Sequence, residues 1–167
     1  MSQGENDALI ARFYDSFAAL DGDAMQACYT AEASFADPVF TLHSRENVGG
    51  MWRMLCDTIR NKGRDAWMLA VSDIGSDAVS GRAHWEPVYR FSATGRLVHN
   101  IVDAQFTFKD GLIDTHRDRF EFWRWSRQAL GPTGAMLGWS SALRNKVRAQ
   151  AALNLATFLR ARARDLD

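Results

Sequence analysis

Four polar side chains in the second half of the sequence are spaced so that two adjacent strands could present them together. The segment Lys109-Asp110-Gly111-Leu112 has the composition of a tight turn between antiparallel strands. Pairing about this turn places the following residues opposite one another on one face: Gln105 and His116, Asp103 and Asp118, Ile101 and Phe120, and His99 and Phe122. A β-bulge in either strand would change this parity.

The two carboxylates of this face, Asp103 and Asp118, would repel each other unless one is protonated or a histidine neutralises the pair. Clusters of this kind supply a general acid and a general base at neutral pH. We therefore predict that His99 and His116 act with the two aspartates in acid–base catalysis at the floor of an apolar pocket. A polar, solvated sheet face at a dimer interface or a sheet edge is the alternative.

Asp37 is a third candidate carboxylate because it stands beside the proline that ends a short strand-like run, residues 33–38. An aspartate before proline also commonly starts a turn. Further along the chain, alternation sends either Trp85 or the pair His84 and Glu86 inward. We expect Trp85 to face inward, as a pocket wall or as part of the core.

The pattern of residues 7–60 predicts helices before and after this short strand. Apolar side chains recur at helical spacing after Asn6 or Asp7 and again after Ser44, and these polar residues could cap the helices. Tyr14 could offer its hydroxyl to a pocket or pack between helices. The aromatic residues of these helices that we expect to bind a substrate are Phe13, Tyr14 and Trp52.

Residues 66–125 switch to β-branched and aromatic runs, which predict a meander of four long antiparallel strands. The runs cover residues 67–74, 79–91, 97–108 and 112–125, and short turn-like segments separate them. Helices followed by a meander give an α+β domain in which helices cover one face of a curved sheet. The strand residues that we expect to line a pocket between the two layers are Trp85, Ile101, Phe120 and Phe122.

Residues 126–167 return to a helical pattern after Gly131-Pro132, with an apolar stripe and six basic residues around it. The formal charge is −5 for residues 1–60 (4 basic, 9 acidic) and +5 for residues 126–167 (7 basic, 2 acidic). We therefore expect the basic tail to dock on the acidic front half, in the same subunit or in a neighbour. Contact of this helix with an acidic membrane surface is the less favoured alternative.

The composition excludes several functional classes. With 20 basic and 20 acidic residues, the chain lacks the charge of a nucleic-acid-binding protein. Its two cysteines have no metal-ligand spacing, its N-terminus has no apolar signal segment, and no run approaches the roughly 18 apolar residues of a membrane span. We therefore expect a cytoplasmic protein without metal or cofactor, made of a domain of residues 1–125 and a helical extension of residues 126–167.

The order of these elements resembles the nuclear transport factor 2-like superfamily over about residues 7–125. That order is a helix, Gly22-Asp23, a second helix, a strand that ends in Asp37-Pro38, a helix start at His43-Ser44-Arg45-Glu46, and the meander. The superfamily includes ketosteroid isomerases, limonene epoxide hydrolases, scytalone dehydratases and SnoaL-like polyketide cyclases. The resemblance implies a cone-shaped curved sheet around the N-terminal helices with a deep apolar cavity, usually in a homodimer.

The resemblance also implies roles for single residues. Asp37 matches the general base of the isomerases, and Asp118 matches the acid–base aspartate of the cyclases. The second, protonated aspartate of the isomerases falls near Asp103. Phe13 stands at the position of their oxyanion-binding tyrosine, with Tyr14 beside it, which argues against steroid isomerisation.

The sequence thus predicts a cofactor-free acid–base enzyme that binds a small hydrophobic molecule. Isomerisation, cyclisation, dehydration and epoxide opening all remain open as its reaction. The alternative is a non-catalytic ligand-binding or dimeric association module, because this fold alone does not determine function.

Overall fold

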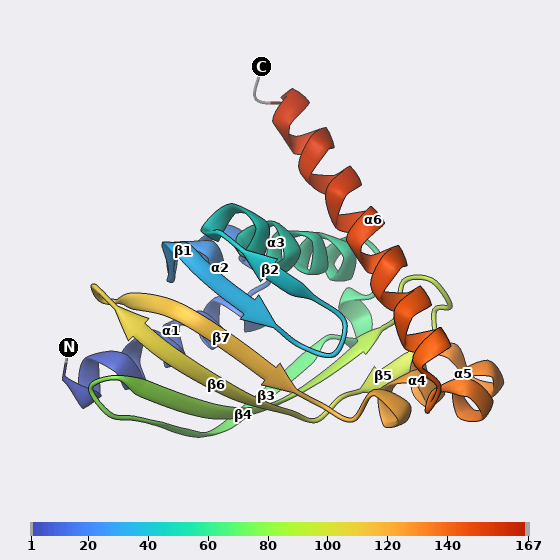
Figure 1. The fold of residues 1–167 in the computed structure, drawn as a ribbon, viewed down its shortest axis with the longest axis horizontal. Coiled ribbons are helices and arrows are strands. Elements are labelled where there is room, and N and C mark those ends of the chain that lie inside the picture. Colours follow the sequence, from blue (N-terminus) through green and yellow to red (C-terminus); the bar gives the residue numbers. More distant parts are fainter. Residues whose placement is uncertain (1, 166–167) are drawn as a thin grey trace.

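The computed structural model describes residues 2–165 and shows an α+β fold in which a curved, seven-stranded sheet carries helices on one face (Figure 1). The helices are α1 (Gln3–Ala18), α2 (Gly22–Ala27), α3 (Arg45–Asn61), α4 (Phe122–Leu130), α5 (Pro132–Leu137) and α6 (Ser141–Asp165), with a 3-10 turn at Arg64–Ala66. The strands are β1 (Tyr29–Ala36), β2 (Thr41–His43), β3 (Met68–Ser76), β4 (Ser80–Arg90), β5 (Leu97–His99), β6 (Val102–Lys109) and β7 (Leu112–Arg119). The predicted fold class is confirmed.

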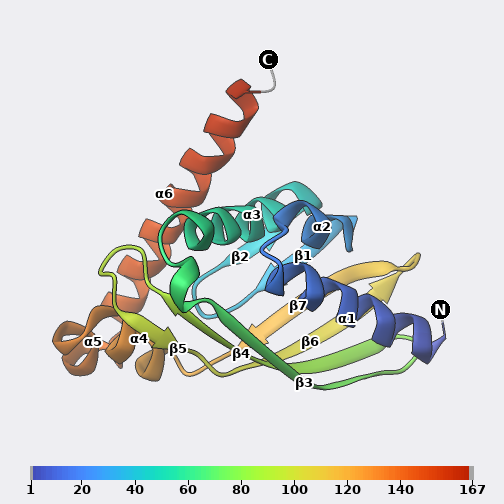
Figure 2. The same cartoon turned by 180° about the vertical axis from the view of Figure 1, so that it is seen from behind.

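The sheet is mixed, with strand order β2-β1-β7-β6-β4-β3 and β5 beside β4. Only the β1–β7 pair is parallel among the described strands. Figure 2 shows α1 and α3 on the same side of the sheet, which we call its inner face. The main hydrophobic core lies between these helices and the sheet and includes buried side chains of both layers.

The helix starts follow from local capping. Ser44 accepts a hydrogen bond from the backbone N–H of Asn47 at the start of α3, as predicted. The first helix begins earlier than predicted, because Ser2 is its N-cap and forms a capping box with Glu5 of its first turn. Asn6 is instead fully buried in α1 and donates its side-chain N–H to the backbone oxygen of Asp77.

The predicted register between β6 and β7 is wrong by one residue, because a β-bulge interrupts the pairing next to Thr107. Beyond it His116 pairs with Phe106 and Asp118 pairs with Ala104, and all four of these side chains are buried on the inner face. Asp103 now pairs with Arg119, and both are exposed on the outer face.

The meander also ends differently from the prediction. The third run is split, because β5 stops at His99 and β6 starts at Val102. The last run leaves the sheet at Arg119 and turns into α4, so Phe122 is a helix residue. Phe122 packs in a second hydrophobic cluster, whose buried members are Val98, Phe122, Trp125 and Ala129.

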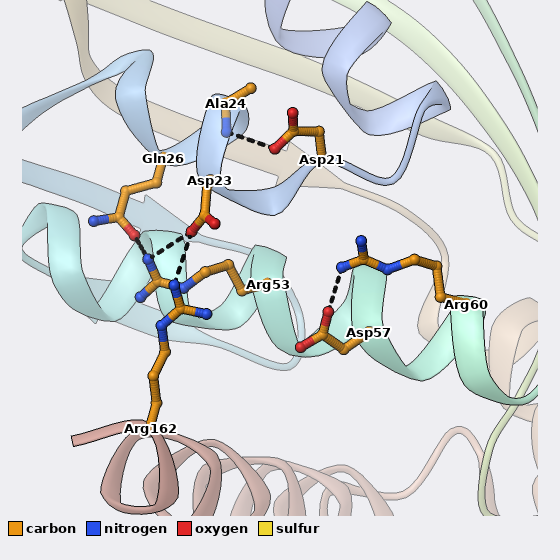
Figure 3. A network of polar contacts seen from close by, with 8 residues as sticks. All are labelled: Asp21, Asp23, Ala24, Gln26, Arg53, Asp57, Arg60 and Arg162. Carbon is orange, nitrogen blue, oxygen red and sulfur yellow. Dashed lines mark hydrogen bonds and ion pairs between the residues drawn. The ribbon is translucent and has the colours of Figure 1, made fainter. Parts of the chain in front are cut away.

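The long helix α6 crosses α3 and projects beyond it (Figure 1). Leu155 is buried, and Leu159 packs so close to Gly50 that a Cβ on this glycine would lie 2.5 Å from it. Figure 3 shows Arg162 of α6 and Arg53 of α3 on the same carboxylate oxygen of Asp23. The basic tail thus contacts the acidic front half within one chain.

The division of the chain at residue 125 into a domain and a helical extension stays a prediction. The helix α4 runs across this position. Within residues 2–165, no helix combines the length and the apolar character needed to cross a membrane.

Candidate functional site

An imidazole surrounded by aromatic rings lies at the centre of the inner face. His116 is 1% exposed, on β7, and its ring centroid lies 4.4 Å from that of Phe106 of β6 and 5.1 Å from that of Phe35 of β1. The other rings within 6.1 Å of it are those of Phe13, Trp52 and Tyr29. We call these six residues the aromatic box. Its rings leave His116 hardly any contact with solvent.

A continuous chain of hydrogen bonds runs through the box. The Tyr29 hydroxyl lies 2.6 Å from Nδ1 of His116, and Nε2 of His116 lies 2.9 Å from Oδ1 of Asp118. The indole nitrogen of Trp52 donates to the Tyr29 oxygen over 3.0 Å, and that of Trp85 donates to Oδ1 of Asp118 over 3.4 Å. Two tryptophans thus end a chain whose middle members are a phenol, an imidazole and a carboxylate.

The donors at the ends of this chain determine where its protons lie. An indole N–H can only donate, so the Tyr29 oxygen accepts from Trp52 and its own proton is available for Nδ1 of His116. His116 then carries its proton on Nε2 and donates it to Asp118. This assignment satisfies every member with a neutral imidazole between the phenol and the carboxylate.

Burial raises the pKa of Tyr29 well above its usual value; the hydrogen bond from Trp52 opposes this rise and the charge of Asp118 adds to it. Tyr29 therefore keeps its proton at neutral pH and shares it with His116. The phenol and the imidazole thus hold the Asp118 carboxylate by hydrogen bonds without adding a second charge to the aromatic box.

Tyr14 brings a second phenol to the same interior. It is 2% exposed, and its hydroxyl has no hydrogen-bond partner among residues 2–165. Burial, and then the charges of Asp118 and Tyr29, raise its pKa well above the usual value. An unpaired buried hydroxyl costs about 1–3 kcal/mol, so this group is placed where a polar atom of a ligand could bind it.

Asp37 lies in the turn between β1 and β2, two residues after Phe35 of the box. Its Oδ1 accepts hydrogen bonds from the backbone N–H groups of Val39 and Phe40. Burial nevertheless raises its pKa to about 7, and the charge of Asp118 contributes to the rise while Arg148 opposes it. The carboxyl group can thus give or take a proton near neutral pH.

Two predicted site residues lie on the opposite face of the sheet. His84 bonds to Asp103 over 2.8 Å and to Glu86 over 3.2 Å, and His99 bonds to Glu86 over 2.6 Å. The side chain of Asp103 is 76% exposed. The prediction that His99 and Asp103 share a face with the inner pair is therefore wrong, and the bulge is the reason.

Of the other residues predicted for the site, some belong to the aromatic box or pack against it and others lie outside it. Phe13 and Trp52 belong to the box, while Tyr14 and Trp85 pack against it. Ile101 is 38% exposed, and Phe120 borders both hydrophobic clusters. The apolar cavity stays a prediction, since aromatic side chains occupy the inner face around the imidazole.

Tyr29, the first residue of β1, is a member of the site that is not among the residues predicted from the sequence. Its strand assignment follows from pairing with Ile113, in a parallel contact that no local pattern reveals. Within residues 2–165, no group of three or more histidine, cysteine or acidic residues could hold a metal ion.

Solved structures share this arrangement of helices and sheet. An epoxide hydrolase of M. tuberculosis resembling limonene epoxide hydrolases superposes with a TM-score of 0.62 at 15% identity, over 81% of this chain and 96% of that one. A candidate polyketide cyclase of Silicibacter gives 0.61 at 18% identity, over 77% and 98%. A candidate ketosteroid isomerase of Kribbella flavida gives 0.56 at 13% identity, over 71% and 79%. Identities this low show likeness of fold alone.

No curated protein matches the sequence. A family model of the SnoaL-like domain, however, matches residues 10–116, which carry the box and most of the sheet. The match spans more than half of the chain and agrees with the resemblance that the motif order indicated. This chain therefore belongs to the SnoaL-like domain family.

Proposed function

We propose that this chain is a cofactor-free enzyme that binds a small hydrophobic molecule and moves protons on it. The observation that carries the proposal is the buried chain from Tyr29 through His116 to Asp118. Desolvated acid–base groups in an aromatic setting are typical of sites that act on apolar substrates. The homodimer and the cytoplasmic location that the sequence predicts belong to this proposal.

The hydrogen bonds assign a role to each group. Both bonds to Asp118 end on Oδ1, so its Oδ2 is available to take a proton from a substrate. His116 and Tyr29 hold the carboxyl group of Asp118 in place through their hydrogen bonds while its charge changes. The unpaired hydroxyl of Tyr14 donates to an oxygen on which negative charge develops. Asp37, in the turn after β1, serves as the second acid–base group.

The names of the similar structures support this class of chemistry. They are those of an epoxide hydrolase, a candidate polyketide cyclase and a candidate ketosteroid isomerase. Acid–base catalysis by positioned side chains is common to the three reactions. They differ in the substrate, and the residues of the box do not select among them.

A substrate panel tests the proposal. Purified protein is incubated with an aliphatic epoxide, a 3-oxo-Δ5 steroid and a poly-β-keto ester, and products are measured by mass spectrometry or ultraviolet absorption. We expect turnover of at least one class by the wild type and by H99Q, whose substitution lies on the outer face. H116Q should lose activity by about 100-fold or more. Equal activities of H116Q and H99Q would contradict the proposed site.

A non-catalytic ligand-binding or dimeric association module is the second candidate. The specific observation in its favour is the close packing of the box, in which the rings of Phe106 and His116 already touch. Under this function, no panel member reacts, yet apolar ligands still quench the tryptophan fluorescence of the chain. Quenching that is unchanged by H116Q would favour this module over the enzyme.

A further inference from the structure

A hollow of about 680 Å³ is lined by exposed side chains of the outer face of the sheet, among them those of Arg82, Gln105 and Arg117. Its lining extends from β2 across β1, β7, β6 and β4 to the turn that joins β3 and β4. We call it the outer groove. Phe35, Phe106 and His116 of the aromatic box also border it, but their side chains are buried on the inner face, so the exposed side chains of the groove are those of the outer face.

Strand register places two arginines and a glutamine in one row across this groove. Arg82 of β4 pairs with Gln105 of β6, and Gln105 pairs with Arg117 of β7. All three residues are exposed. The arginine Cα atoms are two strand spacings apart, about 10 Å. The Arg82 guanidinium lies beside Gly75 of β3 in this structure, and rotation of its long side chain would bring it, with that of Arg117, to the space above Gln105.

The two guanidinium groups are free. Within residues 2–165, neither takes part in an ion pair or a side-chain hydrogen bond. The acidic groups on the neighbouring part of the same face are already bound, since Asp103 and Glu86 contact His84 and His99. The positive charge of the row is thus not neutralised within the described part of the chain.

The next register row supplies hydroxyl groups. It consists of Ser80, Thr107, Thr115, Ser34 and His43, one residue from each of five strands. Asp77 is the one carboxylate among the lining residues that the structure describes. It accepts hydrogen bonds from the backbone N–H groups of Val79 and Ser80. Ser80 donates its hydroxyl to Asp77, and the hydroxyls of Thr107 and Thr115 bond to each other, so the two arginines and Gln105 supply the available donors of the groove.

We propose that the outer groove binds a phosphorylated small molecule, with its phosphate between Arg82 and Arg117 and beside the Gln105 amide. Guanidinium groups match phosphate oxygens in charge and in bidentate geometry. The volume is in the range of small-molecule sites. A second copy of the chain is a poorer occupant, because the Asp103 and Glu86 carboxylates that its own outer face would offer are already paired.

Isothermal titration with two matched pairs of probes tests the proposal: AMP against adenosine, and ribose 5-phosphate against ribose. Inorganic phosphate is the fifth probe and shows whether the anion alone suffices. We expect saturable binding of the phosphorylated member of each pair only. R82Q and R117Q should each raise the Kd about tenfold or more, as expected for the loss of a charge-assisted hydrogen bond.

R119Q is the control, because Arg119 is exposed on the same face but does not line the groove. Its Kd should stay within about twofold of the wild type, and each variant should keep the wild-type Tm. Equal weakening by R119Q would show attraction by overall charge and overturn the proposal. Absence of saturable binding by every phosphate probe would also overturn it. The proposal would be overturned as well if sedimentation showed that R82Q and R117Q dissociate a dimer and the phosphate probes did not bind.

Discussion

Tyr29 and Tyr14 enter the same aromatic interior, but only the hydroxyl of Tyr29 is hydrogen bonded. Y29F would leave the Trp52 indole N–H and Nδ1 of His116 without partners, at about 1–3 kcal/mol each. We expect Y29F to lower the free energy of unfolding by roughly 2–4 kcal/mol, whereas Y14F, which removes an unpaired buried hydroxyl, should leave it unchanged or raise it by up to about 1–3 kcal/mol. Urea denaturation measures both. Equal losses would contradict the hydrogen-bond assignment.

The carboxyl group of Asp37 couples stability to pH. Burial raises its pKa from the usual 3.8 to about 7, so the folded state holds this proton more tightly than the unfolded state does. The resulting stabilisation is complete below about pH 4 and is lost as the pH rises to about 7.

D37N removes this titration. Its unfolding free energy, relative to that of the wild type, should therefore increase between pH 4 and pH 7.5. The upper limit of the increase is about 4 kcal/mol, and the partial exposure of Asp37 reduces it. Denaturation series at several pH values measure the difference. A constant difference across this range would show that the pKa of Asp37 is not raised.

At the scale of elements, α2 can pack on α3 because Gly22 has no side chain. A Cβ there would lie 2.6 Å from the backbone Cα of Arg53. We expect G22A to destabilise the fold by about 1–3 kcal/mol. G4A is the matched control, since Gly4 of α1 has open space around it and alanine favours the helix by roughly 0.5–1 kcal/mol. Thermal unfolding that ranks the two variants in the opposite order would contradict this packing.

The elements also show how far the sequence could predict the site. Helical periodicity and turn residues were enough for α1, α3 and the order of the strands, and thus for Trp52 and Trp85 in the interior. The bulge could not be predicted, because the residues of β7 after Ile113 are polar or charged on both faces. Its inner face carries His116 and Asp118 and its outer face Arg117 and Arg119, so hydrophobicity does not determine the parity.

At the scale of the whole molecule, the charge gradient of the sequence has a counterpart in the structure. Arg162 near the end of α6 reaches Asp23, and Arg148 donates to the backbone oxygen of Pro38 beside the turn that holds Asp37. Charges attract over about 10 Å in salt, which predicts that two segments meet but not where they touch. The position of α6 on α3 depends on the packing of Leu159 against Gly50, and no charge pattern predicts this contact.

The central claim is that the inner face of the sheet, and not the outer face, carries the catalytic carboxylate. Asp118 and Asp103 lie on adjacent strands of one sheet but on opposite faces. The most direct measurement compares the kcat/KM of D118N and D103N on the substrate that the panel identifies, after both variants are shown to fold. We predict a loss of about 100-fold or more for D118N and less than about twofold for D103N. Equal losses, or a larger loss for D103N, would contradict the account.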